Sequence, residues 1–227
     1  MSIWTRIAQA VAALAKGESV AALFDAFRVP PERSVTFTIA VIALGAKMAK
    51  ADGAVTRNEV RAFRRVFTIP KHEERHAAQV FNLARQDVVG FDSYARKIGY
   101  LLKDEPQLLV DLLEGLFHIA VADGTYHPRE NEFLYQVADI FGLGEARFRA
   151  LRARFVDGAA PDPYQVLGVA PEAADDEVRQ AWRQAVLASH PDGMIARGVP
   201  REAIALAEAR LASVNAAWAQ VNRDRAA

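Results

Sequence analysis

The chain has 227 residues, of which 52% are hydrophobic and 25% are charged, so it contains enough apolar sequence to form a packed core. Its 28 Lys and Arg residues balance its 28 Asp and Glu residues, which argues against a nucleic-acid partner bound through phosphate neutralisation. The absence of cysteine excludes disulfides, cysteine-zinc sites and thiol catalysis, and it fits a reducing compartment such as the cytoplasm.

The first segment, residues 1–33, contains an amphipathic helix predicted over residues 3–15. Ile3, Trp4 and Ile7 fall on one face of this helix, which at 1.5 Å per residue is about 20 Å long and too short to cross a bilayer. We expect the apolar face to pack on the chain's own core. The alternative is a peripheral contact with a membrane surface, such as the inner membrane, or with a second copy of the chain.

The rest of the chain is predicted to be all-α, because apolar residues recur at helical spacing and strand-like alternation is absent. The predicted helices of the middle region span residues 35–51, 56–67, 72–85, 91–103, 107–122, 128–141 and 144–155. Two prolines in residues 159–163 prevent helix continuation and mark a linker. The predicted domains are therefore a helical bundle over residues 34–158 and a smaller unit over residues 159–227.

An internal repeat carries four acidic residues within the helical bundle. Asp52 and Glu59 recur as Asp123 and Glu130, each pair separated by 71 residues, and each copy contains an Asp-Gly turn between two helices. Glycine in the turn and an acid in the next first turn suit helix ends, so a structural role explains all four acids. The alternative is that the repeat brings four carboxylates together as a calcium or magnesium site.

The C-terminal unit is organised around the tripeptide His190-Pro191-Asp192, which we call the HPD loop. A helix predicted over residues 175–189 runs into it, and a second helix is predicted over residues 201–222. Pro191 lacks an N–H and biases His190 away from helix, so the tripeptide presents two polar side chains from a stiff bend. Apolar residues at helical spacing should join a short helix to this hairpin: Tyr164, Leu167, Val178, Trp182, Leu211, Val214 and Trp218.

These motifs resemble a J domain, the module by which DnaJ-type co-chaperones stimulate the ATPase of a DnaK-type chaperone. The resemblance implies that the chaperone is bound by His190, Pro191 and Asp192 and by a basic face formed by Arg179 and Arg183. Residues 35–155, with their acidic repeat, resemble the TerB (tellurite-resistance) domain, whose acidic signature positions are thought to bind metal. The order of the two is similar to the DjlA family of co-chaperones, and the phrase at residues 194–202 resembles that family's loop between the HPD tripeptide and the last helix. The TerB-like domain would then be an adaptor or sensor.

The chain departs from this family in two respects. DjlA proteins typically begin with a transmembrane anchor, whereas residues 3–15 form only a short amphipathic segment. The helix before the HPD loop has Gln180, Gln184 and few basic residues where J domains are usually basic. The alternative function is therefore a metal-binding or stress-related interaction module with a degenerate J domain. An enzyme is not predicted, because no nucleophile–base pair, phosphate-binding glycine loop or zinc-protease motif is present.

Overall fold

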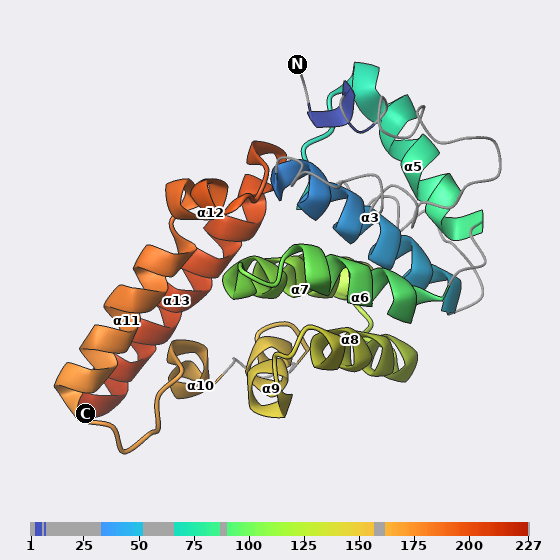
Figure 1. The fold of residues 1–227 in the computed structure, drawn as a ribbon. Coiled ribbons are helices and arrows are strands. Elements are labelled where there is room, and N and C mark those ends of the chain that lie inside the picture. Colours follow the sequence, from blue (N-terminus) through green and yellow to red (C-terminus); the bar gives the residue numbers. More distant parts are fainter. Residues whose placement is uncertain are drawn as a thin grey trace.

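The computed structural model describes residues 3–5, 7, 33–51, 66–86, 90–156 and 162–226, and every regular element among them is helical (Figure 1). The elements are α3 (Arg33–Ala51), η1 (Lys71–Glu73), α5 (Glu74–Gln86), α6 (Phe91–Leu101), α7 (Pro106–Ala120), η2 (Val121–Asp123), α8 (Pro128–Ile140), α9 (Glu145–Ala153), α10 (Pro163–Leu167), α11 (Asp175–Ser189), α12 (Pro191–Arg197), η3 (Arg201–Ala203) and α13 (Ile204–Ala226). None of the helices in these ranges combines the length and apolarity needed to span a membrane.

A larger core is built around α3 and α7, which lie side by side at the centre of the molecule (Figure 1). Helix α3 is buried along nearly its whole length, and α5, α6 and α8 also contact it. Ile3, Trp4 and Ile7 are buried in this core, and the Trp4 ring meets the edge of Phe67 at a centroid distance of 6.1 Å. The predicted packing of the N-terminal apolar face is confirmed for these three residues, and the rest of residues 3–15 lies outside the described ranges apart from Thr5.

A smaller core joins α10 to the α11–α13 hairpin. Its buried residues are Val166, Leu167, Val178, Val214, Ala217 and Val221. Trp182 and Trp218 stack against it with ring centroids 4.9 Å apart, and Trp182 Nε1 donates to Asn215 Oδ1 at 3.2 Å. The predicted core role of both tryptophans is confirmed, whereas Leu211 is half-buried and does not belong to this cluster.

The two cores meet within the C-terminal unit. Met194, Val199 and Leu206 are buried among the helices of the larger core, although they follow the HPD loop in the sequence. Helix α13 therefore packs its first turns on the larger core and its later turns on the smaller one. In the chain, the HPD loop lies between α11, which packs in the smaller core, and α12, which packs in the larger one.

One predicted loop is a helix. The family resemblance predicts a loop at residues 194–202, but Pro191–Arg197 form α12. The sequence contains the signals for it, because Pro191 is at the first helical position, Asp192 is in the first turn, and Gly198 ends the helix with a φ of 116°. The last helix begins with the short turn η3 and continues beyond the predicted end to Ala226.

Candidate functional site

The HPD loop is a sharp bend between two helices. His190 ends α11 and begins α12, with an extended backbone at φ −64° and ψ 133°. The next helix then starts at Pro191, and the Met194 N–H donates to the His190 carbonyl at 3.0 Å. The fixed φ of proline and the helix on each side hold the tripeptide in one geometry.

The polar side chains of the loop are exposed but ordered by one internal hydrogen bond. His190 Nδ1 accepts from the Asp192 backbone N–H at 3.2 Å, and the Asp192 carboxylate lies 3.8 Å from the same nitrogen. The side chains of His190 and Asp192 are 55% and 90% exposed. In a neutral imidazole whose Nδ1 accepts a hydrogen bond, Nε2 carries the ring proton and can donate to a partner. The loop thus offers a partner one N–H donor and one carboxylate acceptor.

The exposed face of α11 leads up to this loop. Arg179 and Arg183 are both exposed and lie one helical turn apart, as the sequence predicts. Leu187 continues the same row one turn further and is 73% exposed, which is unusual for a large apolar side chain. Sequence reasoning missed Leu187, although its spacing of four from Arg183 was a usable signal. The face combines two cations and one apolar contact next to the HPD loop.

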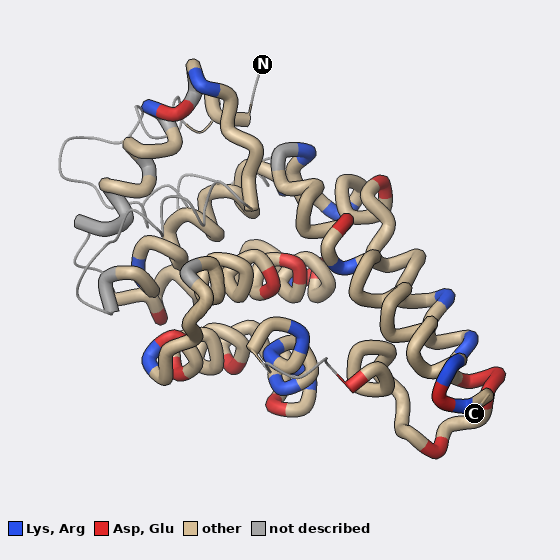
Figure 2. The backbone as a smooth tube through the Cα atoms, turned by 180° about the vertical axis from the view of Figure 1, so that it is seen from behind, with Lys and Arg blue, Asp and Glu red and all other residues tan. Residues whose placement is uncertain are grey.

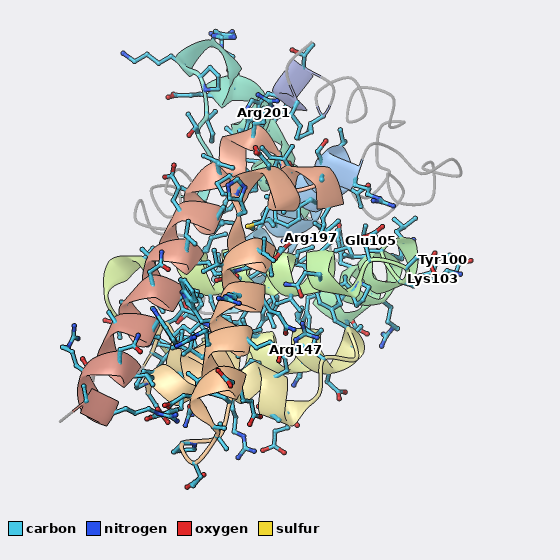
Figure 3. The ribbon with its side chains drawn as sticks, turned by 90° about the vertical axis from the view of Figure 1, so that its left-hand side faces the viewer. Tyr100, Lys103, Glu105, Arg147, Arg197 and Arg201 are labelled. Atoms are coloured by element: carbon cyan, nitrogen blue, oxygen red, sulfur yellow. The ribbon has the colours of Figure 1, made fainter. Side chains whose placement is uncertain are left out.

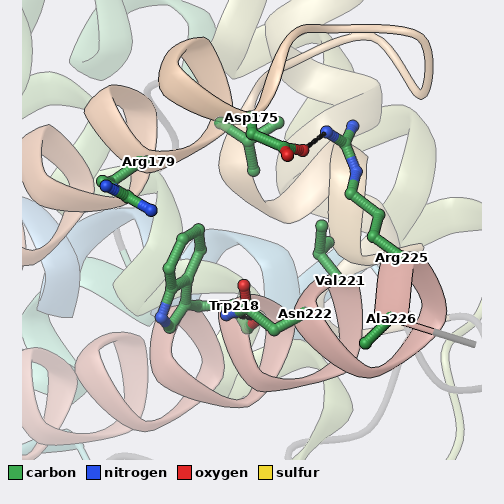
Figure 4. Close-up of a pocket in the computed structure, with 8 residues that line it drawn as sticks. Asp175, Arg179, Trp218, Val221, Asn222, Arg225 and Ala226 are labelled. Carbon is green, nitrogen blue, oxygen red and sulfur yellow. Dashed lines mark hydrogen bonds and ion pairs between the residues drawn. The ribbon is translucent and has the colours of Figure 1, made fainter.

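The opposite end of the hairpin gathers acidic and basic residues near the C-terminus (Figure 2). Asp175, Asp176 and Glu177 are exposed in the first turn of α11. Arg225 offsets one of them, because its Nη1 lies 2.6 Å from Asp175 Oδ1. A shallow pocket of about 220 Å³ lies between this pair, Arg179 and Trp218 (Figure 4). Arg225 thus neutralises part of the acidic charge at the start of α11.

A buried group of charged side chains joins α7 to the two helices that follow the HPD loop, α12 and α13. Asp111 and Glu114 of α7 are buried, and they pair with Arg197 of α12, Arg210 of α13 and Arg154. Sequence reasoning also missed this group. Its one available signal was the presence of two acids within the otherwise apolar helix at residues 107–122.

The acidic repeat is described only in its second copy. Gly124 adopts the predicted left-handed conformation at φ 89°, and Glu130 accepts from the His127 N–H at 2.8 Å in a capping box. Asp52 and Glu59 lie outside the described residues, and the side chain of Asp123 is not described. Within the described side chains no cluster of three metal-binding groups is found. The capping role of Glu130 supports the structural explanation, and the metal site stays a prediction.

Comparisons with known proteins match both parts of the chain. The family described as tellurite resistance protein TerB matches residues 38–153, and the DnaJ domain matches residues 162–225. A Photobacterium profundum protein named Co-chaperone protein DjlA is 27% identical in an alignment that covers 86% of this chain and 79% of that protein. Proteins of the same name from Coxiella burnetii and Vibrio cholerae are 28% and 24% identical, covering 78% and 86% of this chain and 73% and 80% of their own lengths. No solved structure matches.

Proposed function

We propose that this chain, which belongs to the TerB family, stimulates ATP hydrolysis by a DnaK-type chaperone through His190, Pro191 and Asp192. Its DnaJ domain follows the TerB domain, as in DjlA-type co-chaperones. The observation that carries this proposal is the HPD loop itself. Its two polar side chains are exposed on a stiff bend between α11 and α12. A preorganised loop loses little conformational entropy when it binds.

The J domain acts on the partner and supplies no catalytic group of its own. Asp192 would accept a charge-assisted hydrogen bond from a cationic group of the chaperone, and His190 Nε2 would donate a second hydrogen bond. Arg179 and Arg183 would steer the encounter with an acidic surface, while Leu187 would add apolar area beside the loop. Binding of this kind stimulates hydrolysis when the J domain prefers the chaperone conformation that is competent for hydrolysis.

The TerB domain would serve as the adaptor or sensor of the co-chaperone, working in the cytoplasm beside its chaperone partner. A peripheral contact with the inner membrane through residues 3–15 has less support. Ile3, Trp4 and Ile7, which would have to insert into the lipid, are buried in the protein core instead. An adaptor role is supported by the contact between the two domains, because Met194, Val199 and Leu206, which follow the HPD loop, are buried in the core of the TerB domain.

The test is steady-state ATP hydrolysis by the DnaK-type chaperone of the same organism, with increasing amounts of the chain. We expect the native chain to raise turnover and His190→Gln to abolish the effect, because glutamine cannot reproduce the imidazole geometry at the bend. His72→Gln is the matched control, since it makes the same chemical change at an exposed histidine of the TerB domain. Failure of the native chain to stimulate at any concentration would overturn the proposal.

The alternative function, a metal-binding or stress-related module with a degenerate J domain, rests on the acidic first turn of α11 and on the acidic repeat. Calorimetric titration with calcium, magnesium and manganese discriminates between the two. The co-chaperone proposal expects stimulation by metal-free protein. Heat of binding that is lost in Asp52→Asn and Asp123→Asn, together with no ATPase stimulation, would favour the alternative.

A further inference from the structure

We propose that Asp111 of the TerB domain and Arg197 of the J domain are positioning residues that fix the orientation of the HPD loop. This inference rests on the proposed function and concerns how the same loop is presented to the chaperone. It begins from a contact between parts of the chain that lie 86 residues apart. Arg197 Nε and Nη2 both donate to Asp111 Oδ2 at 3.3 Å. Arg197 lies where the J-domain helices meet α7 (Figure 3).

The same guanidinium reaches the end of α11. Arg197 Nη2 donates to the Ala188 carbonyl at 2.8 Å, two residues before His190. In a continuing helix this carbonyl would accept from the Asp192 N–H. The Asp192 N–H instead donates to His190 Nδ1, so the bend of the HPD loop leaves the Ala188 carbonyl in need of another donor. Arg197 provides that donor and ties the end of α11 to α12.

Asp111 holds Arg197 in this position and is itself firmly placed. Its side chain is fully buried on α7, and Arg210 Nη1 contacts its second oxygen, Oδ1, at 2.7 Å. A buried carboxylate without partners is unfavourable, and Arg210 remains an ionic partner of Asp111 when Arg197 is replaced. Replacing Arg197 should therefore free the HPD loop without unfolding the TerB domain, because Asp111 keeps its pairing with Arg210.

The geometry has a functional consequence. Asp111 of the TerB domain binds Arg197 of the J domain, and Arg197 in turn binds the Ala188 carbonyl at the end of α11, the helix that leads to His190. A chaperone that binds one orientation of the loop would meet a smaller competent fraction when this connection is cut. Its apparent affinity falls in proportion to that fraction, whereas the effect at saturation is retained.

Two variants cut the connection at different ends. Arg197→Ala removes the donor to Ala188, and Asp111→Asn keeps the size of the side chain but removes the charge that holds Arg197. Arg197→Lys retains the positive charge with a single donor group, so it should restore part of the effect. Arg201→Ala is the matched control, because Arg201 is an exposed arginine four residues further along, and its side chain lies outside the buried group (Figure 3).

The measurements are ATPase stimulation as a function of co-chaperone concentration and amide hydrogen exchange of the full chain. For Arg197→Ala we expect the half-maximal concentration to rise about fivefold or more, the lower end of typical coupling between sites, with the same stimulation at saturation. Exchange should become faster at residues 186–193 and stay unchanged at residues 208–221. Arg201→Ala should match the native chain in both measurements.

The outcomes separate this inference from the proposed function. If the native chain does not stimulate the chaperone, the proposed function fails, and the exchange rates of residues 186–193 alone decide the positioning role. If the native chain stimulates and Arg197→Ala is unchanged in both half-maximal concentration and exchange, the inference is overturned. If Asp111→Asn fails to fold, Arg197→Ala decides the question, because Asp111 keeps its pairing with Arg210 in that variant.

Discussion

The two halves of the J domain are stabilised in different ways. The half that is remote from the HPD loop has its own small core, formed by α10, α11 and the end of α13. The half that follows the loop packs on the core of the TerB domain, to which it contributes Met194, Val199, Ala203, Leu206 and Ala207. A functional loop can therefore gain a rigid base from a neighbouring domain, and the stability of that base is then a property of both domains.

The largest effect on stability is expected at Arg210, whose ion pairs join the J domain to α7 of the TerB domain. Arg210 is 6% exposed and pairs with both Asp111 and Glu114. Arg210→Met would leave two buried carboxylates with weaker compensation, so the free energy of unfolding should fall by about 3–5 kcal/mol. Chemical denaturation measures this, with Arg183→Met as an exposed control that should change it by less than about 0.5 kcal/mol. If Arg210→Met lowered the free energy of unfolding by less than about 1 kcal/mol, the ion pairs of Arg210 would not be what holds the two domains together.

Leucine truncations in the two cores test whether the halves respond separately. Leu206 lies in the larger core and Leu167 in the smaller one, and each is nearly fully buried. Replacement by alanine should cost about 2–5 kcal/mol at either site because a cavity is left. Hydrogen exchange should accelerate in both α7 and α12 for Leu206→Ala, but mainly in α10 and α11 for Leu167→Ala. Identical exchange patterns would mean that the J domain is one unit and the comparison fails.

A pH effect is expected in the larger core. Burial lowers the pKa of His118 from 6.5 to about 4, and its ring meets the edge of Phe155 at 4.7 Å. Between these values the unfolded chain binds a proton that the folded chain does not, so stability falls as the pH drops from 6.5 towards 4. The loss is at most about 3 kcal/mol. Unfolding of His118→Leu should depend less on pH over this interval, and an unchanged slope would contradict the assignment.

The smallest effects concern two glycines that end helices. A Cβ at Gly198 would clash with Arg33 Cβ, whereas a Cβ at Gly168 would meet open space. Both glycines have a positive φ, which costs other residues about 1–2 kcal/mol. Gly168→Ala should therefore lower the unfolding free energy by about 1 kcal/mol, and Gly198→Ala by at least about 1 kcal/mol more. Equal losses in thermal unfolding would show that the contact with Arg33 is readily relieved.

Local signals in the sequence predicted much of the fold. Helical spacing gave α11 its observed bounds of 175 and 189, and the tripeptide located the loop without any structure. The core placement of Trp182 and Trp218 followed from their apolar spacing within a hairpin, whereas their stacking on each other is a finding of the structure. These features depend on neighbouring residues, on helix ends and on the absence of an N–H in proline, so they can be recognised in a single sequence.

The parts that were missed depend on contacts between distant residues. Asp111 and Arg197 lie far apart in the chain, and no local pattern marks two charges as partners. Leu187 is exposed because the inner face of the hairpin is already filled by Val178 and its neighbours, a packing that only the structure shows. The helix α12 was overlooked because the resemblance suggested a loop there, although Pro191 and Gly198 carry ordinary start and stop signals.

Single-turnover hydrolysis tests the central claim most directly, because it observes the chemical step without nucleotide release. The DnaK-type chaperone is loaded with ATP and mixed with a saturating amount of the chain. The account predicts accelerated hydrolysis with the native chain and with Arg197→Ala, and no acceleration with His190→Gln. An unchanged rate with the native chain, or equal acceleration by His190→Gln, would contradict the assignment of the HPD loop as the group that acts on the chaperone.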